Sequence, residues 1–157
     1  MKTITSLSII LLSIAIIYWL IYVFVISPAD DDLHYLTEAI YYEARGEPLK
    51  GQIAVAHVIL NRVKDPKYPD TIEEVIKHPK QFSYRNKLPL PPITNPFRYQ
   101  IAKTIANETL KGNTSDHSRG AEYYLNLNTF QDDSWVYSMT KTVKIGKHTF
   151  YKNNPSH

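Results

Sequence analysis

Residues 33–63 decide the fold, and they read LHYLTEAIYYEARGEPLKGQIAVAHVILNRV. In the first half of this stretch, apolar residues recur at spacings of three and four: Leu33, Leu36, Ile40 and Ala44. This spacing is typical of one face of a helix, so we predict a helix from about Asp31 to Arg45. Gly46 is suited to end it, because glycine readily adopts the left-handed backbone found just beyond many helices.

A second helix is predicted directly after this glycine. Glu47-Pro48 opens it, because proline is favoured in the first turn of a helix. Its apolar residues are spaced by four, three, four and three positions: Leu49, Ile53, Ala56, Leu60 and Val63. This pattern predicts an amphipathic helix that ends before the Asp65–Pro69 segment.

Local signals predict the elements that follow. Thr71 with Glu74 forms a capping-box pattern, which indicates a short helix ending near His78. The proline-rich segment Lys80–Pro96 is expected to form a loop or a small hairpin. The pair Asn95-Pro96 is a favourable cap and first turn for a helix that reaches Gly112.

The C-terminal part is rich in aromatic and β-branched residues. Thr142–Ile145 and His148–Tyr151 flank Gly146-Lys147, which is the arrangement of a β-hairpin. We therefore predict an α+β, mostly helical fold.

The chain begins with an apolar run from Ile4 to Ile26. As a helix this run would extend about 34 Å, enough to cross a bilayer core. We interpret residues 1–29 as a transmembrane anchor or uncleaved signal, with a cleaved signal or a buried globular helix as alternatives. Lys2 before the run and Asp30–Asp32 after it favour a cytoplasmic N-terminus. The expected location is the inner (cytoplasmic) membrane, single-pass, with residues 30–157 in the periplasm or outside the cell.

Composition excludes several functional classes. The net charge is +3 and the basic residues are scattered, so nucleic acid is not an expected partner. The absence of cysteine excludes disulfides, Cys-ligated zinc and a Cys nucleophile. The six histidines show no tight ligand spacing, and the sequence has neither a Gly-rich phosphate loop nor a GxSxG motif. No metal and no other cofactor is expected.

Glu43 is the residue whose position points to acid chemistry. It follows Ile40 by three positions and Leu36 by seven, so the predicted helix carries it beside the apolar stripe. Burial of a carboxyl group raises its pKa, which is how a general acid keeps its proton near neutral pH. Tyr41 and Tyr42 are expected to provide aromatic surroundings. The alternative is a surface ion pair of Glu43 with Arg45 or with another basic residue.

Aromatic and amide side chains are abundant in the rest of the chain. Aromatic rings can stack on sugar rings while amides bond to hydroxyl groups, so this composition fits a sugar-binding groove. A small hydrophobic core would use the same aromatic residues. The set is Phe82, Tyr84, Tyr99, Tyr123, Tyr124, Trp135, Tyr137, Phe150 and Tyr151, with Gln81, Asn126 and Asn128.

The residues from Ala39 to Val63, which include Glu-Ala-Arg-Gly-Glu at 43–47, closely resemble the SleB-type cell-wall hydrolase family. This family is known from spore cortex-lytic enzymes and phage lysis proteins. The likeness continues through four further segments: Tyr68–Ile72, Gln81–Ser83, Gly120–Tyr124 and Ile145–Tyr151.

The resemblance implies a lysozyme-like, lytic-transglycosylase-like catalytic domain over residues 30–157, with a groove for peptidoglycan glycan strands. It implies that Glu43 is the catalytic acid and that Glu47 organises the turn and the start of the next helix. It also implies five substrate contacts: Gln81, Phe82, Ser83, Tyr123 and Tyr124.

Cleavage is expected between N-acetylmuramic acid and N-acetylglucosamine. Most glycosidases use two carboxyl groups, whereas only Glu43 has a strong motif around it. A lytic transglycosylase needs one acid/base, because the muramyl 6-hydroxyl attacks and a 1,6-anhydro end forms. The alternatives are a hydrolytic muramidase, with a water held by Asp116, Glu122 or Asp132, a non-catalytic membrane-tethered peptidoglycan-binding module, and a holin-like membrane protein.

Overall fold

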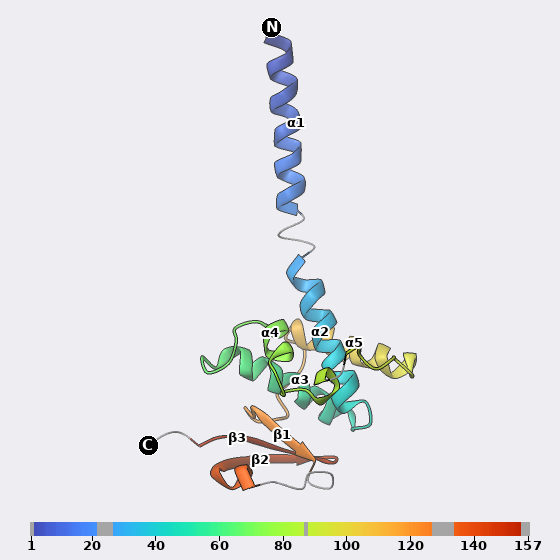
Figure 1. Cartoon of the computed structure of the whole chain (residues 1–157), viewed down its shortest axis with the longest axis vertical. Coiled ribbons are helices and arrows are strands. Elements are labelled where there is room, and N and C mark those ends of the chain that lie inside the picture. The colour runs from blue at the N-terminus through green and yellow to red at the C-terminus, as the bar shows by residue number, and fades with distance from the viewer. Residues whose placement is uncertain (1, 22–26, 87, 127–133, 155–157) are drawn as a thin grey trace. The chain divides into compact units, whose positions relative to one another are not determined.

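The computed structural model describes residues 2–21, 27–86, 88–126 and 134–154 of the 157-residue chain (Figure 1). It divides into two compact units, residues 1–32 and residues 33–157.

The first unit contains helix α1, Lys2–Ile21, and the first residues of helix α2, Ser27–Ala44. The predicted apolar span of residues 4–26 includes positions 22–26, which lie outside the described residues. In the described ranges, no helix combines the length and the apolar character that a membrane crossing requires. The expected transmembrane helix is therefore not supported by the structure.

The second unit has helices α3, Leu49–Lys64, α4, Ile72–Lys77, and α5, Pro96–Leu110, besides most of α2. The two expected caps are confirmed. Thr71 Oγ1 accepts a hydrogen bond from the Glu74 amide at 3.2 Å, and Asn95 Oδ1 accepts one from the Arg98 amide at 3.0 Å. The segment between α4 and α5 contains a short 3-10 helix, η2, Ser83–Asn86. In the described part of this segment there is no strand, so the hairpin alternative is wrong.

A three-stranded antiparallel sheet completes the unit, with the strand order β1-β3-β2. Its strands are β1, Tyr123–Asn126, β2, Met139–Ile145, and β3, His148–Asn153, and a 3-10 helix, η3, Ser134–Ser138, precedes β2. The predicted hairpin is confirmed, because Ile145 pairs with His148 across the turn. The central strand is β3, and Tyr124 of β1 pairs with its Phe150.

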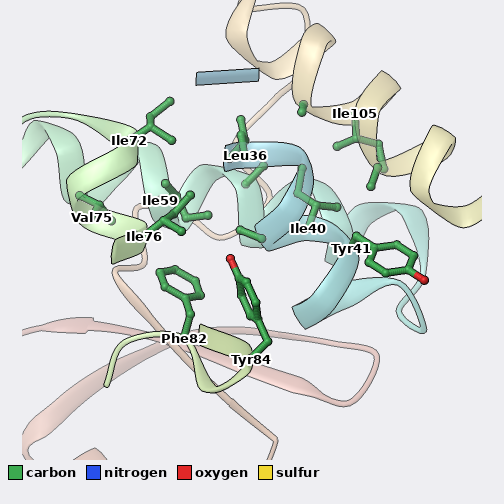
Figure 2. Packing of buried hydrophobic residues seen from close by; sticks show 14 residues of the cluster. Leu36, Ile40, Tyr41, Ile59, Ile72, Val75, Ile76, Phe82, Tyr84 and Ile105 are labelled. Atoms are coloured by element: carbon green, nitrogen blue, oxygen red, sulfur yellow. The ribbon is translucent and has the colours of Figure 1, made fainter. Parts of the chain in front are cut away.

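The main core lies among the helices of this unit (Figure 2). Leu36 and Ile40 of α2 pack with Ile59 of α3 in this cluster. Phe82 and Tyr84 point into the same cluster from the loop between α4 and α5 (Figure 2). A second cluster joins the helices to the sheet: Ala44, Ala54, Val55, Val58, Ala121 and Phe150.

Helix α3 is buried on more than its predicted stripe. Leu49, the first residue of that stripe, is 59% exposed, while Val55 and Val58 are fully buried. Two clusters explain the difference: α3 packs against α2 through one and against the sheet through the other. A helix with core on both sides needs more apolar positions than a single stripe provides.

Candidate active site

A cavity of about 570 Å³ lies in the second unit. Four of its lining residues come from the loop around η2: Lys80, Gln81, Ser83 and Asn86. Strand β1 and the start of β3 provide another group: Tyr123, Tyr124, Leu125, Asn126 and His148. Glu43 from the end of α2 and Arg62 from α3 complete the lining. The cavity therefore brings together segments that are far apart in the sequence.

Glu43 is the carboxyl group in this lining. Burial raises its pKa above the ordinary value for glutamate. Two influences act in the opposite direction: the Tyr124 hydroxyl donates a hydrogen bond to the carboxyl group, and the positive charge of Arg62 favours the ionised form. Burial is the largest of the three, so Glu43 keeps its proton to a higher pH than an exposed glutamate. This is the property required of a general acid.

Tyr124 is held by the sheet and by aromatic contacts. Its ring lies 5.0 Å from the His148 ring and 6.0 Å from the Phe150 ring, measured between centroids. Burial, followed by the charge of Glu43, raises the pKa of Tyr124 well above its ordinary value. Tyr124 therefore remains protonated and serves as a hydrogen-bond donor to Glu43.

Arg62 is a cavity residue that the sequence reasoning missed. Only 5% of it is exposed, and its Nε donates a hydrogen bond to the Glu122 carbonyl oxygen at 2.7 Å. The sequence does contain one signal: Arg62 follows Ile59 by three positions and Val58 by four, so it shares their buried side of the helix. A charged residue at such a position needs a structural or functional reason.

The loop before β1 is built around Asp116. Its carboxylate accepts hydrogen bonds from the Ser118 amide and hydroxyl, from the Gly120 amide and from Asn61 Nδ2. Burial alone would raise the pKa of Asp116, but these hydrogen bonds outweigh it and lower the pKa. Asn61 also donates to the Ala121 carbonyl oxygen at 3.0 Å. Asp116 thus fixes the loop that leads into Tyr123 and Tyr124.

Glu47 connects the turn after α2 to the sheet. Its Oε2 accepts a hydrogen bond from the Lys147 amide at 2.9 Å, in the turn between β2 and β3. Gly146 has a φ of +58°, and a Cβ atom there would lie 2.1 Å from Glu47 Oε2. The backbone of Glu47 also contacts the first turn of α3, because Gln52 Nε2 donates to the Glu47 carbonyl oxygen at 3.0 Å. The contact with the hairpin spans 100 positions and was not predicted.

The structure brings five of the six predicted site residues to this cavity: Glu43, Gln81, Ser83, Tyr123 and Tyr124. The sixth, Phe82, is 1% exposed and belongs to the core among the helices (Figure 2). The expectation that Phe82 contacts the substrate is therefore wrong, because its ring is enclosed by other side chains.

The predicted surroundings of Glu43 are also revised. The Tyr41 ring is fully buried, and its hydroxyl accepts hydrogen bonds from the Thr94 and Asn95 amides. Tyr42 stacks on Tyr84 at 4.6 Å. The two tyrosines therefore brace α2, and the aromatic neighbours of Glu43 come from β1.

The predicted alternative, an ion pair of Glu43 with Arg45, is absent among the described residues. The Arg45 guanidinium lies 4.8 Å from the centre of the Tyr41 ring instead. Within the described ranges, no three His, Asp or Glu side chains are grouped so that they could hold a metal ion.

Other aromatic residues considered for a groove have different roles. Phe150 is buried in the cluster between the helices and the sheet. Tyr151 is buried in a third cluster, with Leu125 and Val136. Tyr137 is 81% exposed and does not line the cavity. The Trp135 side chain, Asn128 and Asp132 lie outside the described part of the chain.

Comparisons with known proteins identify a matching family and several relatives of this chain. Residues 46–151 match a family described as Cell Wall Hydrolase, a range that begins just after Glu43. Two relatives are the spore cortex-lytic enzymes of Halalkalibacterium halodurans and Bacillus subtilis, with sequence identities of 37% and 34%. Each alignment covers 78% of this chain. The matched part is 35% and 38% of those two proteins, so the chain corresponds to less than half of their length.

Two solved structures resemble that of this chain. One is the catalytic domain of the Bacillus cereus SleB protein, with a TM-score of 0.65 and 34% identity over 81% of this chain and 94% of that one. The other is the catalytic domain of the germination-specific lytic transglycosylase SleB from Bacillus anthracis. Its TM-score is 0.66, with 34% identity over 81% of this chain and 98% of that one.

Proposed function

The chain belongs to the cell wall hydrolase family, and on that premise we propose that its second unit cleaves peptidoglycan glycan strands between N-acetylmuramic acid and N-acetylglucosamine. Glu43 is the general acid and base of this reaction. The observation that carries the proposal is a partly buried carboxyl group with a raised pKa in a cavity lined by tyrosine and amide side chains.

The cavity lining is suited to a sugar chain. Tyr123 and Tyr124 present aromatic rings, and Gln81 and Asn126 present amides. Rings can stack against the apolar faces of sugars, and amides can bond to hydroxyl and N-acetyl groups. We propose that Gln81, Ser83, Tyr123 and Tyr124 contact the glycan strand.

The reaction begins when the Glu43 carboxyl group donates its proton to the oxygen of the glycosidic bond. The bond from the muramyl C1 to that oxygen breaks, and N-acetylglucosamine leaves with the donated proton. The muramyl 6-hydroxyl oxygen then bonds to C1, and its proton passes to the Glu43 carboxylate. The acid is regenerated and a 1,6-anhydro end forms, so one carboxyl group completes the cycle.

The contacts of the other acidic residues favour this route over hydrolysis. Most hydrolytic glycosidases use a second carboxyl group within about 5 to 9.5 Å of the first. In the described ranges, Glu43 is the acidic residue that lines the cavity. Asp116 is occupied by the hydrogen bonds of its own loop, and Glu122 Oε2 accepts from Asn153 Nδ2 at 2.7 Å. The similarity to a lytic transglycosylase supports the same route.

The raised pKa also distinguishes an enzyme from a binding module. A module that only binds sugars needs the aromatic and amide groups but has no use for a desolvated acid. Glu43 therefore favours a catalytic role for the cavity.

Digestion of purified sacculi in ¹⁸O-labelled water, followed by mass spectrometry, tests the reaction. We expect muramyl ends that are one water lighter than reducing ends and carry no ¹⁸O. A digest of the same sacculi with a hydrolytic muramidase is the control and gives labelled reducing ends. Labelled ends from this protein would assign it to the muramidases, and intact glycan strands would refute cleavage.

We further propose that the second unit works in the periplasm or outside the cell, because peptidoglycan lies there. A C-terminal reporter that is active only after export tests this location. Activity of that reporter in growing cells is the expected result, and activity only of a cytoplasmic reporter would contradict the proposal.

A further inference from the structure

Among the residues that the structure describes, Arg62 is a buried cation without a carboxylate partner. It is 5% exposed, and in the described part of the chain no Asp or Glu oxygen lies within 4.0 Å of its guanidinium. Its Nε is bonded to the Glu122 carbonyl oxygen, but its buried Nη1 has no hydrogen-bond partner among the described residues. Buried charges are usually paired, because removing an ion from water is costly. Arg62 is therefore an exception that needs an explanation.

Three aromatic rings surround this guanidinium. Its central carbon lies 5.6 Å from the Tyr68 ring centre, 5.8 Å from Phe82 and 5.7 Å from Tyr123. Aromatic faces attract cations without neutralising them. The rings therefore hold Arg62 at the cavity, while no carboxylate of the described ranges compensates its positive charge.

Glu43 is the carboxyl group that shares this cavity with Arg62. The charge of Arg62 acts on Glu43 and lowers its pKa, in opposition to burial. Other titratable groups also line the cavity. Lys80 contributes a second cation, burial lowers the pKa of His148 and so favours its neutral form, and Tyr124 keeps its proton. The remaining phenol is that of Tyr123.

We infer that Arg62 is a positioning residue of the cleavage reaction, whose unpaired guanidinium supplies the counter-charge for the Glu43 carboxylate that forms when the acid donates its proton. The inference rests on the proposed function. In the proposed cycle Glu43 carries its proton before the reaction, and Arg62 then has no carboxylate to pair with in the described part of the chain. After the proton moves to the glycosidic oxygen, the carboxylate and the guanidinium attract each other.

This arrangement favours the transition state over the ground state. Interactions that strengthen only as charge develops accelerate a reaction, whereas equal binding of both states does not. The guanidinium is already fixed by the rings, so it needs little reorganisation when the carboxylate forms. When the muramyl 6-hydroxyl returns a proton to Glu43, the pair is neutralised and the initial state is restored.

Three variants test the inference. Arg62→Gln removes the charge, Arg62→Lys keeps it, and Lys64→Gln removes the same charge from an exposed position on the same helix. The Glu43 carboxyl pKa is followed by ¹³C NMR in the free protein, and the pH profile of kcat is measured on purified glycan strands. Circular dichroism verifies that each variant is folded.

In Arg62→Gln we expect the Glu43 pKa and the alkaline limb of the kcat profile to move up by about one pH unit, because the charge that lowers this pKa is gone. One unit is the lower end of the shift that a nearby opposite charge causes. We expect maximal kcat to fall about tenfold. Arg62→Lys should recover most of both properties, and Lys64→Gln should change neither. A folded Arg62→Gln with an unchanged limb, or Arg62→Lys with the same defect as Arg62→Gln, would overturn the inference.

A second measurement needs no change at Arg62. The ¹⁵N signals of the Arg62 guanidinium in the unmodified protein should titrate with the Glu43 pKa, and this step should vanish in Glu43→Gln. Guanidinium signals that ignore the Glu43 titration would refute the inference. Cleavage by Glu43→Gln would instead refute the proposed function, so the two failures are distinguishable.

Discussion

The proton of Glu43 is controlled by groups from three elements of the fold. Burial of this α2 residue raises its pKa, while Tyr124 of β1 and Arg62 of α3 favour the ionised form. Burial alone would make a weak acid that holds its proton too tightly to donate it. In the proposed reaction, the opposing donor and charge would keep Glu43 acidic enough to donate its proton, which is the compromise that proton transfer requires.

The raised pKa of Glu43 has a consequence for stability. In the unfolded chain a glutamate ionises near pH 4.3, and in the folded protein burial moves the pKa upward. The contribution of protonated Glu43 to the free energy of unfolding is therefore complete below the unfolded pKa. It is lost as the pH rises through the folded pKa. Glutamine does not ionise, so we expect Glu43→Gln to melt at a higher temperature than the unmodified protein at neutral pH.

Thermal unfolding between pH 4 and 8 measures this effect. The difference in Tm should shrink toward the acidic end, where Glu43 is protonated in both states. A difference that is absent throughout, or that grows toward acidic pH, would show that burial does not raise the Glu43 pKa.

Tyr124→Phe removes the hydroxyl that donates to Glu43 but keeps the ring. A hydrogen bond to a charged group contributes about 1.5 to 3 kcal/mol, so we expect kcat to fall about tenfold or more. The alkaline limb of the pH profile should move upward, because the carboxylate loses a donor. Tyr137→Phe is the matched control, since Tyr137 is 81% exposed and lies outside the cavity lining. Equal kcat values for the two variants would contradict the role of Tyr124.

At the residue scale, the sequence predicts the burial of Glu43 but not its partners. The position of Glu43 beside the apolar stripe depends only on helical spacing, which is a local property. Gln81, Phe82 and Ser83 lie in a loop segment, which has no regular spacing of buried positions. The sequence therefore could not indicate that Phe82 is the buried residue of the three. Arg62 was missed because a single sequence does not indicate which buried helix face meets a cavity.

The β2–β3 hairpin is attached to the helices through the turn between α2 and α3. Glu47 accepts a hydrogen bond from the hairpin turn, and Gly146 leaves room for the carboxylate. His148, which follows this turn, lines the cavity and packs against Tyr124. The position of the hairpin turn therefore determines where the groups around Glu43 lie.

Gly146→Ala tests this attachment. The new Cβ would lie 2.1 Å from Glu47 Oε2, and the φ of +58° is unfavourable for alanine. Gly112→Ala is the control, because Gly112 has a φ of +76° and nothing within 4 Å of the added Cβ. We expect Gly112→Ala to lose about 1 kcal/mol of unfolding free energy through backbone strain, and Gly146→Ala to lose more.

Denaturant unfolding and turnover distinguish the two variants. Gly146→Ala should also lose cleavage activity, since the hairpin must shift, while Gly112→Ala should cleave normally when folded. Equal losses in both measurements would mean that Glu47 and Gly146 do not position the hairpin.

At the element scale, local signals predicted the helices and the closing hairpin well. The caps at Thr71 and Asn95 are confirmed because each depends on residues only three positions apart. The pairing of β1 with β3 was not predicted, because it joins residues that are far apart in the sequence, such as Tyr124 and Phe150. Such pairing depends on tertiary contacts that no local pattern encodes.

In the whole molecule, the core clusters and the candidate site all lie within residues 33–157. The two solved catalytic domains match 81% of the chain. We therefore expect a variant that lacks residues 1–26 to fold cooperatively and to cleave purified glycan strands like the full chain. Loss of cooperative unfolding in circular dichroism would show that the first unit is needed for the fold of the second.

The central claim is that a single carboxyl group, Glu43, carries the proton that breaks the glycosidic bond. The most direct measurement is turnover of purified sacculi by Glu43→Gln, with sacculus binding and circular dichroism recorded on the same sample. We predict that cleavage falls at least a thousandfold, while binding and fold stay as in the unmodified protein. A folded Glu43→Gln protein that still cleaves at a substantial fraction of the original rate would contradict the account.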